Sequence, residues 1–453
     1  MNIKRLLFVV APLILLCWSP IINAAESEKV LTLDKAIDIA LQYNITLRQS
    51  TNQLGTSKIT MDQKKANFLP EFSVSAGTTE RFAKDYDSTT GKYSGTTSNS
   101  ISASATATYN LFNGFSDRAS LQQARLDFKS SGFDVTRTRQ SIIFQTIQQF
   151  IQVVTTREFI SVEKENLEAQ RLLLKRIEDY YKSGKRPVTD FYQQQAQISS
   201  AELQLLNAQR NYEVNKLLLM QILGWDSGTD FEVVDPGIDQ LLTRVLNYKK
   251  ENILDAAMKT RADILSQELQ VEAANQGIII AKSGYYPKLS LSGDLSSSYS
   301  KQSSLFNFPD QFFKNNLGGS IRLSLSVPVF DKFRTKYSVA NANIALKNQK
   351  LELEKKQLQV HVELQQALQD FQTAVKQMDV AENQLTYSKQ ALDSIQERYD
   401  VNASTMIELT QSRALYLQAV YDRIQARFNV LIRGISISYY KGDGDEMINL
   451  LAK

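Results

Sequence analysis

Residues 329–433 contain neither glycine nor proline, and so long a run without a turn residue leaves few folds open. An ordinary globular enzyme needs turns far more often. Apolar side chains recur every seven residues in the run, at Leu364, Phe371, Met378, Leu385, Leu392 and Tyr399. This spacing predicts a long helix at 332–400 that packs along a coiled-coil seam, followed by a return helix at 405–440.

The same pattern occurs earlier in the chain, because the sequence is internally duplicated. A shift of 217 or 218 residues brings the halves into register. Matched pairs include Phe112 with Phe330, Tyr181 with Tyr399, Asp190 with Glu408 and Gly224 with Gly442. A fixed offset over so many residues indicates one structural unit used twice. Each unit is expected to run helix, two strands, long helix and return helix.

The duplication sets the expected domain organisation. The first repeat spans 26–224, a linker follows at 225–252, the second repeat spans 253–442, and 443–453 form a tail. In the first repeat the long helix is expected at 115–182 and the return helix at 188–223.

Four segments alternate strictly between apolar and polar residues. In one of them Ile101, Ala103 and Ala105 alternate with Ser102 and Ser104. The expected strands are 68–82, 99–113, 286–300 and 318–330. Alternation with serine and threonine on one face is typical of a sheet with lipid on one side and water on the other. The alternative is a soluble antiparallel sheet with one buried face.

Four strands are too few to close a barrel, since single-chain membrane barrels begin at about eight. A bilayer tolerates no open sheet edge, so strands in lipid would have to be shared between several chains. The loops expected at the strand tips differ in character. Lys84–Ser98 is polar and rich in glycine, serine and threonine. Ser300–Gly318 carries four phenylalanines, which would lie at the lipid headgroups or over the pore mouth.

The N-terminus indicates export. Lys4 and Arg5 precede an apolar run from Leu6 to Trp18, and small residues follow up to position 25. Residues 1–25 are therefore predicted to be a secretory signal peptide. Its apolar run is shorter than the ~20 residues of a spanning helix. If the mature chain enters a membrane, it is expected to do so with strands.

Composition excludes several classes of protein. Cys17, the only cysteine, lies in the predicted signal, and His361 is the only histidine, which argues against thiol chemistry, histidine triads and multi-histidine metal sites. Without the signal, 50 basic residues face 48 acidic ones, so nothing attracts a nucleic acid. No nucleotide-binding loop occurs. The sequence predicts a protein without catalysis, cofactor or metal.

Several motifs, in this order and duplicated, resemble the TolC-like outer-membrane efflux proteins. They are Leu33–Leu41, Phe68–Pro70, Tyr109–Gly114, Tyr286–Leu289 and Ser326–Asp331. The resemblance covers essentially the whole mature chain. It implies an α+β membrane protein of a Gram-negative bacterium, a homotrimer in which three chains share a twelve-stranded transmembrane β-barrel and a long periplasmic α-helical barrel.

The resemblance also implies a function. Members of the family, the trimeric outer membrane factors, are passive exit ducts for multidrug efflux and type I secretion. They dock to periplasmic adaptor (membrane fusion) proteins and to inner-membrane transporters of the RND, ABC or MFS type. A soluble periplasmic coiled-coil scaffold or adaptor is the alternative from another class. The residues do not identify the cargo.

Site residues follow from the resemblance only by position. Family tunnels close at the periplasmic helix turns through polar links, with acidic rings just inside. Asp190 and Tyr399 resemble partners in the closing links, and Glu408 resembles a member of an acidic ring. The family's arginine of a second link is replaced here by Ser404, and a second acidic position by Gln411.

The turns themselves are the expected adaptor contacts, at Ser183, Gly184, Lys185, Val401, Asn402 and Ala403. A second interpretation of the acidic residues stays open. Thr405 to Glu408 fits a capping box at a helix start. Asp190 follows Pro187 by three residues, which suits the first turn of a helix.

Overall fold

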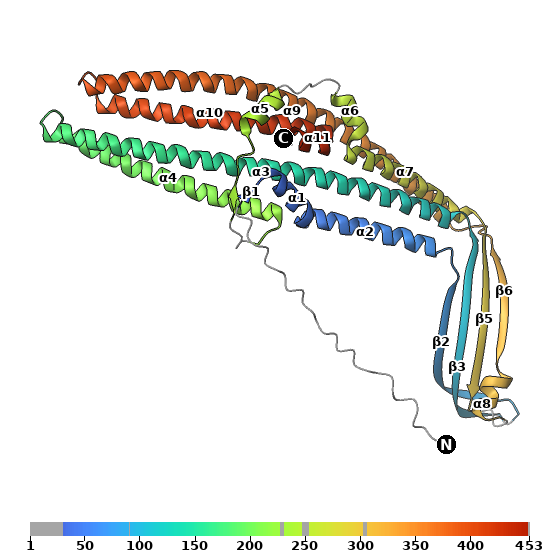
Figure 1. Cartoon of the computed structure of the whole chain (residues 1–453). Coiled ribbons are helices and arrows are strands. Elements are labelled where there is room, and N and C mark those ends of the chain that lie inside the picture. Colours follow the sequence, from blue (N-terminus) through green and yellow to red (C-terminus); the bar gives the residue numbers. More distant parts are fainter. Residues whose placement is uncertain (1–29, 90, 227–230, 247–252, 302–305, 452–453) are drawn as a thin grey trace.

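The protein is described by a computed structural model. The described residues are 30–89, 91–226, 231–246, 253–301 and 306–451. Long helices lie side by side in an extended body, and a sheet projects from one end (Figure 1). The predicted signal peptide at 1–25 lies outside the described residues.

The helices of the two repeats correspond one to one. The first repeat has α1 (Leu33–Tyr43), α2 (Ile45–Ala66), α3 (Ser116–Lys182) and α4 (Val188–Leu223). The second has α6 (Ile253–Thr260), α7 (Ala262–Lys282), α9 (Arg334–Asp400) and α10 (Met406–Lys441). At 67 residues each, α3 and α9 are about 100 Å long.

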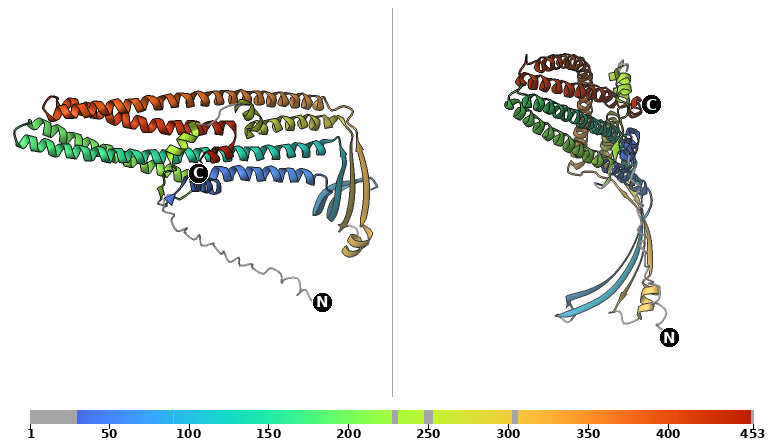
Figure 2. Two further views of the ribbon diagram at one scale, coloured as in Figure 1. Left: turned by 45° about the horizontal axis from the view of Figure 1, so that its top comes forward. Right: turned by 60° about the vertical axis from the view of Figure 1, so that its left-hand side comes forward.

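These helices form two coiled pairs and one row. α3 packs against α4, and α9 packs against α10, in antiparallel pairs that run away from the sheet (Figures 1 and 2). Toward the sheet, α2, α3, α7 and α9 contact one another in that order. The two central helices of the row are therefore α3 and α7.

The four long strands form one antiparallel sheet in the order β2-β3-β5-β6. Their bounds are β2 Glu71–Asp87, β3 Lys92–Asn113, β5 Lys288–Ser300 and β6 Gly318–Ser326. The register places apolar residues opposite one another: Val74 faces Ala105, which faces Leu295. Serine and threonine occupy the positions between them. One face of the sheet is thus apolar and the other polar.

Two predicted strand ends are wrong in the first repeat. Residues 84–98 were expected to form a loop, but β2 continues to Asp87 and β3 begins at Lys92. The pairing runs without interruption to Asp87 opposite Lys92. A hairpin can continue through polar side chains as long as its backbone groups are paired with each other. The turn was therefore predicted in the wrong place, because polar residues alone do not mark its start and end.

The predicted strand 318–330 is too long, since β6 ends at Ser326. Pro328 has no N–H to donate to a strand ladder, which explains an end before it. The loop before β6 contains a short helix, α8 (Phe308–Asp310), and a π-helical turn (Gln311–Asn315). Its aromatic rings pack on one another, and Phe308 stacks on Phe312 with centroids 5.2 Å apart.

Strand and helix meet through residues with left-handed backbone conformation in both repeats. Phe115 and Phe333, which are equivalent by the duplication, have φ values of 69° and 61°. Gly114 also has a positive φ, of 69°. A Cβ at Gly114 would lie 2.6 Å from the carbonyl oxygen of Ser283. Only glycine fits this junction between the repeats.

The main hydrophobic core lies around the middle of the helices. The predicted linker and tail contribute β4 (Glu232–Val233), α5 (Ile238–Leu246) and α11 (Gly444–Leu451). β4 pairs in parallel with β1 (Val30–Leu31). Side chains from α1, α3, α5, α9 and α10 meet in one buried cluster. This belt holds both repeats together.

Candidate functional site

The candidate site lies at the ends of the coiled pairs, far from the sheet (Figures 1 and 2). One turn joins α3 to α4 and contains Gly184 with φ 71°. The other joins α9 to α10 and contains Asn402 with φ 62°. All six residues that were predicted to contact an adaptor are exposed on these turns: Ser183, Gly184, Lys185, Val401, Asn402 and Ala403. They are accessible from outside the body.

Asp190 and Tyr399 are brought together between the two coiled pairs. Tyr399, near the end of α9, is fully buried, and its hydroxyl donates a hydrogen bond of 3.2 Å to Oδ2 of Asp190 on α4. Burial, and then the negative charge of Asp190, raise the pKa of Tyr399 to about 12. The phenol therefore stays a hydrogen-bond donor at neutral pH.

A third residue, Arg186, completes this contact. Its guanidinium carbon lies 3.9 Å from the ring centroid of Tyr399, and its Nη1 lies 3.6 Å from Oδ2 of Asp190. Arg186 also donates a hydrogen bond to the carbonyl oxygen of Tyr399. Asp190, Tyr399 and Arg186 together are called the latch below. A cation over an aromatic face is attractive, more so where water is excluded.

The sequence analysis missed Arg186 as a partner in this contact. It lies in the α3–α4 turn, next to residues that were expected only to contact an adaptor. The guanidinium of the latch thus comes from the α3–α4 turn. In the α9–α10 turn, the position at which the family resemblance implies an arginine holds Ser404. The one signal in the sequence was that Arg186 lies four residues before Asp190, a spacing at which side chains can contact each other along a helix.

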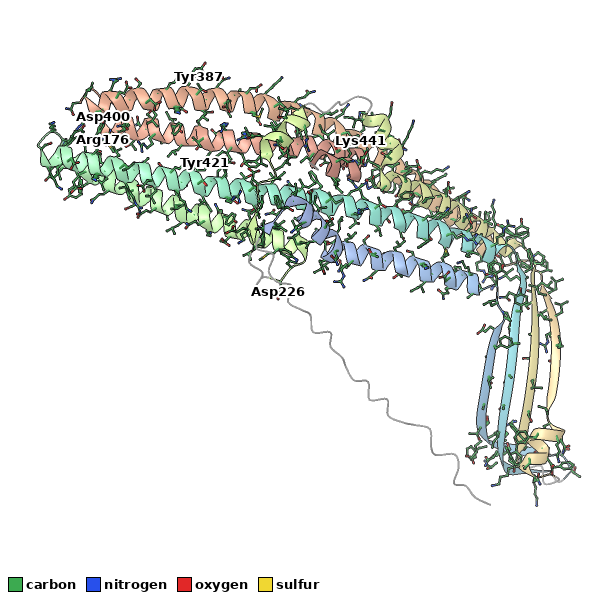
Figure 3. All side chains as sticks on the ribbon, in the orientation of Figure 1. Arg176, Asp226, Tyr387, Asp400, Tyr421 and Lys441 are labelled. Atoms are coloured by element: carbon green, nitrogen blue, oxygen red, sulfur yellow. The ribbon has the colours of Figure 1, made fainter. Side chains whose placement is uncertain are left out.

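A second ion pair also joins the coiled pairs, and it too was missed. Arg176 of α3 donates from Nη1 to both carboxylate oxygens of Asp400, each at 3.0 Å. Both residues lie at the ends of the coils (Figure 3). About half of the Arg176 side chain is exposed. Such a partly exposed pair contributes ~1 kcal/mol or less to stability.

Glu408 is engaged by the start of its own helix. Its Oε2 accepts a hydrogen bond of 3.2 Å from the backbone N–H of Thr405, and it also accepts one from the Ser404 hydroxyl. In return the backbone N–H of Glu408 donates to Oγ1 of Thr405, at 3.2 Å. These bonds lower the pKa of Glu408. The geometry is a complete capping box, and the hydrogen-bond partners of Glu408 do not include the latch.

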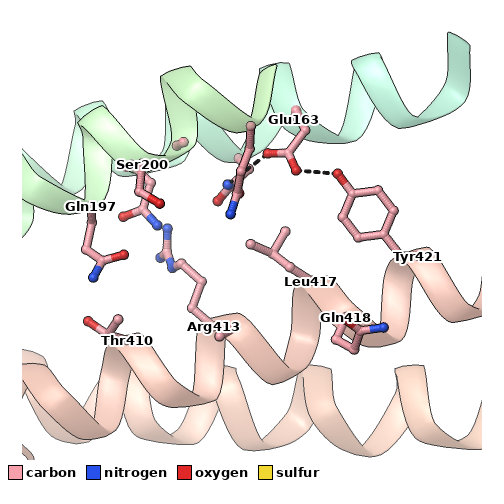
Figure 4. A pocket seen from close by; sticks show the side chains of 13 residues that line it. Glu163, Gln197, Ser200, Thr410, Arg413, Leu417, Gln418 and Tyr421 are labelled. Carbon is pink, nitrogen blue, oxygen red and sulfur yellow. Dashed lines mark hydrogen bonds between the residues drawn. The ribbon is translucent and has the colours of Figure 1, made fainter. Parts of the chain in front are cut away.

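Further from the turns, a polar cavity of about 290 Å³ lies between the coiled pairs (Figure 4). Glu163 of α3, 4% exposed, accepts a hydrogen bond from the hydroxyl of Tyr421 on α10. Arg413 extends from α10 toward Gln197 and Ser200, and its Nε has no hydrogen bond with any described residue. Burial lowers its pKa. Polar contacts, rather than a dry core, thus join the coils here.

No described helix is both long enough and apolar enough to cross a bilayer. Within the described ranges, histidine, cysteine and acidic side chains form no group of three that could hold a metal ion.

The fold and the site define a class of protein: an internally duplicated chain in which a four-stranded sheet joins long coiled helices that make polar contacts at their turns. Residues 36–225 and 253–440 match the family of outer membrane efflux proteins. This chain belongs to that family.

Relatives and solved structures agree with this assignment. The pyoverdine export outer membrane protein OpmQ of Pseudomonas aeruginosa is 22% identical over 385 residues, 84% of this chain and 78% of OpmQ. Outer membrane protein TolC of Escherichia coli is 22% identical over 424 residues, 90% of this chain and 81% of TolC. The Campylobacter jejuni CmeC outer membrane channel has the same fold, with a TM-score of 0.76 at 19% identity over 91% of this chain and 86% of CmeC.

Family membership places the protein in the outer membrane of a Gram-negative bacterium, as an efflux channel protein. The family consists of channel proteins rather than enzymes.

Proposed function

We propose that the protein is a passive trimeric exit duct whose three chains share one twelve-stranded barrel and one periplasmic helical tunnel. The proposal rests on the sheet, which has four strands and one apolar face. Its two edge strands, β2 and β6, pair with no further described strand. On the apolar face Ile321 and Val74 are 85% and 83% exposed in the single chain. In a closed ring, the edge strands would pair with strands of the neighbouring chains, and lipid would cover the apolar face.

The duct would work as the outer part of a tripartite efflux pump or a type I secretion system. The exposed turns at 183–185 and 401–403 would contact a periplasmic adaptor protein. An inner-membrane transporter of the RND, ABC or MFS type would supply the energy. Two relatives support a role in export, since they are named for it: the pyoverdine export protein OpmQ, and toxin and drug export protein A of Aggregatibacter actinomycetemcomitans.

The latch would hold the periplasmic entrance closed. It joins α9 to the turn and the first residues of α4, so a separation of α9 and α10 from α3 and α4 at this end would have to break it. Three Glu408 carboxylates around a threefold axis would add a ring attractive to cations. In this proposal Glu408 both caps α10 and contributes to the ring, since the capping bonds leave the side chain exposed.

The test is the state and conductance of the purified protein. The protein extracted in detergent should have the mass of a trimer by light scattering. In planar bilayers it should form a channel that rests at low conductance. A monomer that stays soluble without detergent would contradict the proposal and favour a periplasmic scaffold.

A further inference from the structure

Positively charged residues gather where the sheet meets the helices. Each helix of the row carries one near its sheet end: Lys64 in α2, Arg118 in α3, Lys282 in α7 and Lys336 in α9. At a membrane surface, such residues attract anionic headgroups.

One part of this region is a groove of about 460 Å³ between α3 and α7. Arg118, Gln122 and Arg125 line it from α3, at the four- and three-residue spacing of a single helix face. Ile279 lines it from α7. Because α3 and α7 are the central helices of the row, neighbouring chains in a ring would contact α2 and α9 and leave this groove uncovered.

The groove opens toward the apolar face of the sheet. Phe112 pairs with Leu289 and lies on that face. Phe115, which lines the end of the groove near the sheet, packs edge-on against Phe112 with ring centroids 5.1 Å apart and against Tyr286 at 5.7 Å. In membrane barrels, girdles of aromatic residues flank the apolar band at both interfaces.

The two arginines have no acidic partner among the described residues. Arg118 and Arg125 are exposed, and neither forms a hydrogen bond or an ion pair with any residue that the structure describes. Arginine is suited to bind a phosphate through two parallel N–H donors. Two uncompensated guanidinium groups beside exposed phenylalanine and isoleucine match a ligand that joins a phosphate to an apolar tail.

We propose that this groove binds an anionic phospholipid of the periplasmic leaflet. The phosphate lies between Arg118 and Arg125, and the first part of the acyl chains contacts Phe115 and Ile279. The inference rests on the proposed function in that the apolar face of the sheet must lie in lipid.

Native mass spectrometry of the full-length protein in mixed micelles tests the site. The micelles contain equal amounts of dioleoyl phosphatidylglycerol and dioleoyl phosphatidylcholine. The wild type should retain the anionic lipid preferentially. Arg118→Gln should reduce that preference about fivefold, and Arg118→Gln with Arg125→Gln on the order of 25-fold. Arg139→Gln is the matched control, since Arg139 is an exposed arginine of α3 that forms no ion pair with a described residue. It lies about 21 Å further from the sheet than Arg125.

Unchanged lipid preference in the double variant would overturn the site. Two further arms identify the ligand. Phe115→Ala should weaken retention of the lipid, and an excess of inorganic phosphate should displace it only partly. Complete displacement by phosphate, with no effect of Phe115→Ala, would indicate a phosphate site and contradict the lipid. Bilayer conductance of the double variant distinguishes a failure of the lipid site from a failure of the proposed function. A trimeric channel that shows no lipid preference would contradict the lipid site but not the proposed duct.

Discussion

Three side chains form the latch, and each contributes a different interaction. Tyr399 supplies a hydroxyl donor and a ring face, Asp190 a buried carboxylate, and Arg186 a guanidinium that touches both. Removing one partner leaves the others with unpaired polar atoms in a water-poor site, which costs more than the bond itself contributes. The latch should therefore be sensitive to small changes.

Tyr399→Phe removes only the hydroxyl and its bond to Asp190. We expect the latch to weaken by about 1–3 kcal/mol, which includes leaving Asp190 short of a donor. The resting single-channel conductance in planar bilayers should rise. Tyr387→Phe is the control, because Tyr387 lies on the same helix and is 68% exposed (Figure 3). Equal resting conductance in both variants would remove Tyr399 from the gate.

Variants of Glu408 test whether one carboxylate both caps α10 and contributes to the proposed acidic ring. Its pKa is lowered by hydrogen bonds from Ser404 and Thr405, so its capping contribution is fully present above its ordinary pKa and is lost as pH falls through the lower, folded-state value. The thermal midpoints of wild type and Glu408→Gln should therefore differ at pH 7, and the difference should shrink as the pH falls below the ordinary glutamate pKa of about 4.3.

The control for the capping role is Thr405→Ala, which should cost about 1 kcal/mol of stability but leave the charge in place. If Glu408→Gln lowers cation selectivity and Thr405→Ala does not, the ring is real. If neither variant changes selectivity, Glu408 is a cap alone.

At the scale of elements, the junction of strand and helix in the first repeat leaves no room for a side chain at Gly114. The chain leaves β3 and enters α3 through Gly114 and Phe115, both with positive φ. At this point the carbonyl oxygen of Ser283 from the other repeat lies against Gly114. The junction therefore sets how the two repeats sit beside each other.

Gly114→Ala should disturb this junction. A side chain there would combine a left-handed backbone, at about 1–2 kcal/mol, with a contact of 2.6 Å to backbone. We expect less heat-resistant oligomer on gels. Gly132→Ala on α3 is the control, since a Cβ there meets nothing within 4 Å and alanine favours helix by up to about 1 kcal/mol. Equal amounts of oligomer in both variants would contradict this role of Gly114.

Periodicity predicted the long helices better than the strand ends. Heptads and proline positions placed α3, α4, α9 and α10 to within two residues of their observed ends. The tip of the first hairpin was predicted in the wrong place. The length of a hairpin depends on how two segments pair, and the pattern within one segment does not determine that pairing. Alignment by position found Asp190 and Tyr399, whereas Arg186 reaches them only through a turn whose shape the sequence does not specify.

At the scale of the whole molecule, the sheet is incomplete in one chain. Its apolar face carries large exposed side chains, while its other face is lined by serine and threonine. An exposed apolar area of this kind signals contact with lipid or protein. Under the proposed function, strands of further chains pair with the edges of the sheet and lipid covers its apolar face.

Ile321→Arg tests which face meets lipid. An arginine on the lipid side of a barrel costs up to about 4 kcal/mol, depending on depth. We expect less protein in the outer-membrane fraction of cells. Ser324→Arg on the opposite face of the same strand is the control and should insert normally, as Arg322 already points to that face. Normal insertion of both variants would contradict the assignment of the faces.

Tyr399 and Asp190 belong to the same polypeptide, so the latch joins two coiled pairs of one copy. In the proposed trimer, the latch of one copy would then break while the latches of the other two stay intact. In a threefold assembly the aperture would widen in thirds, and recordings from individual molecules would show a staircase of currents instead of one jump.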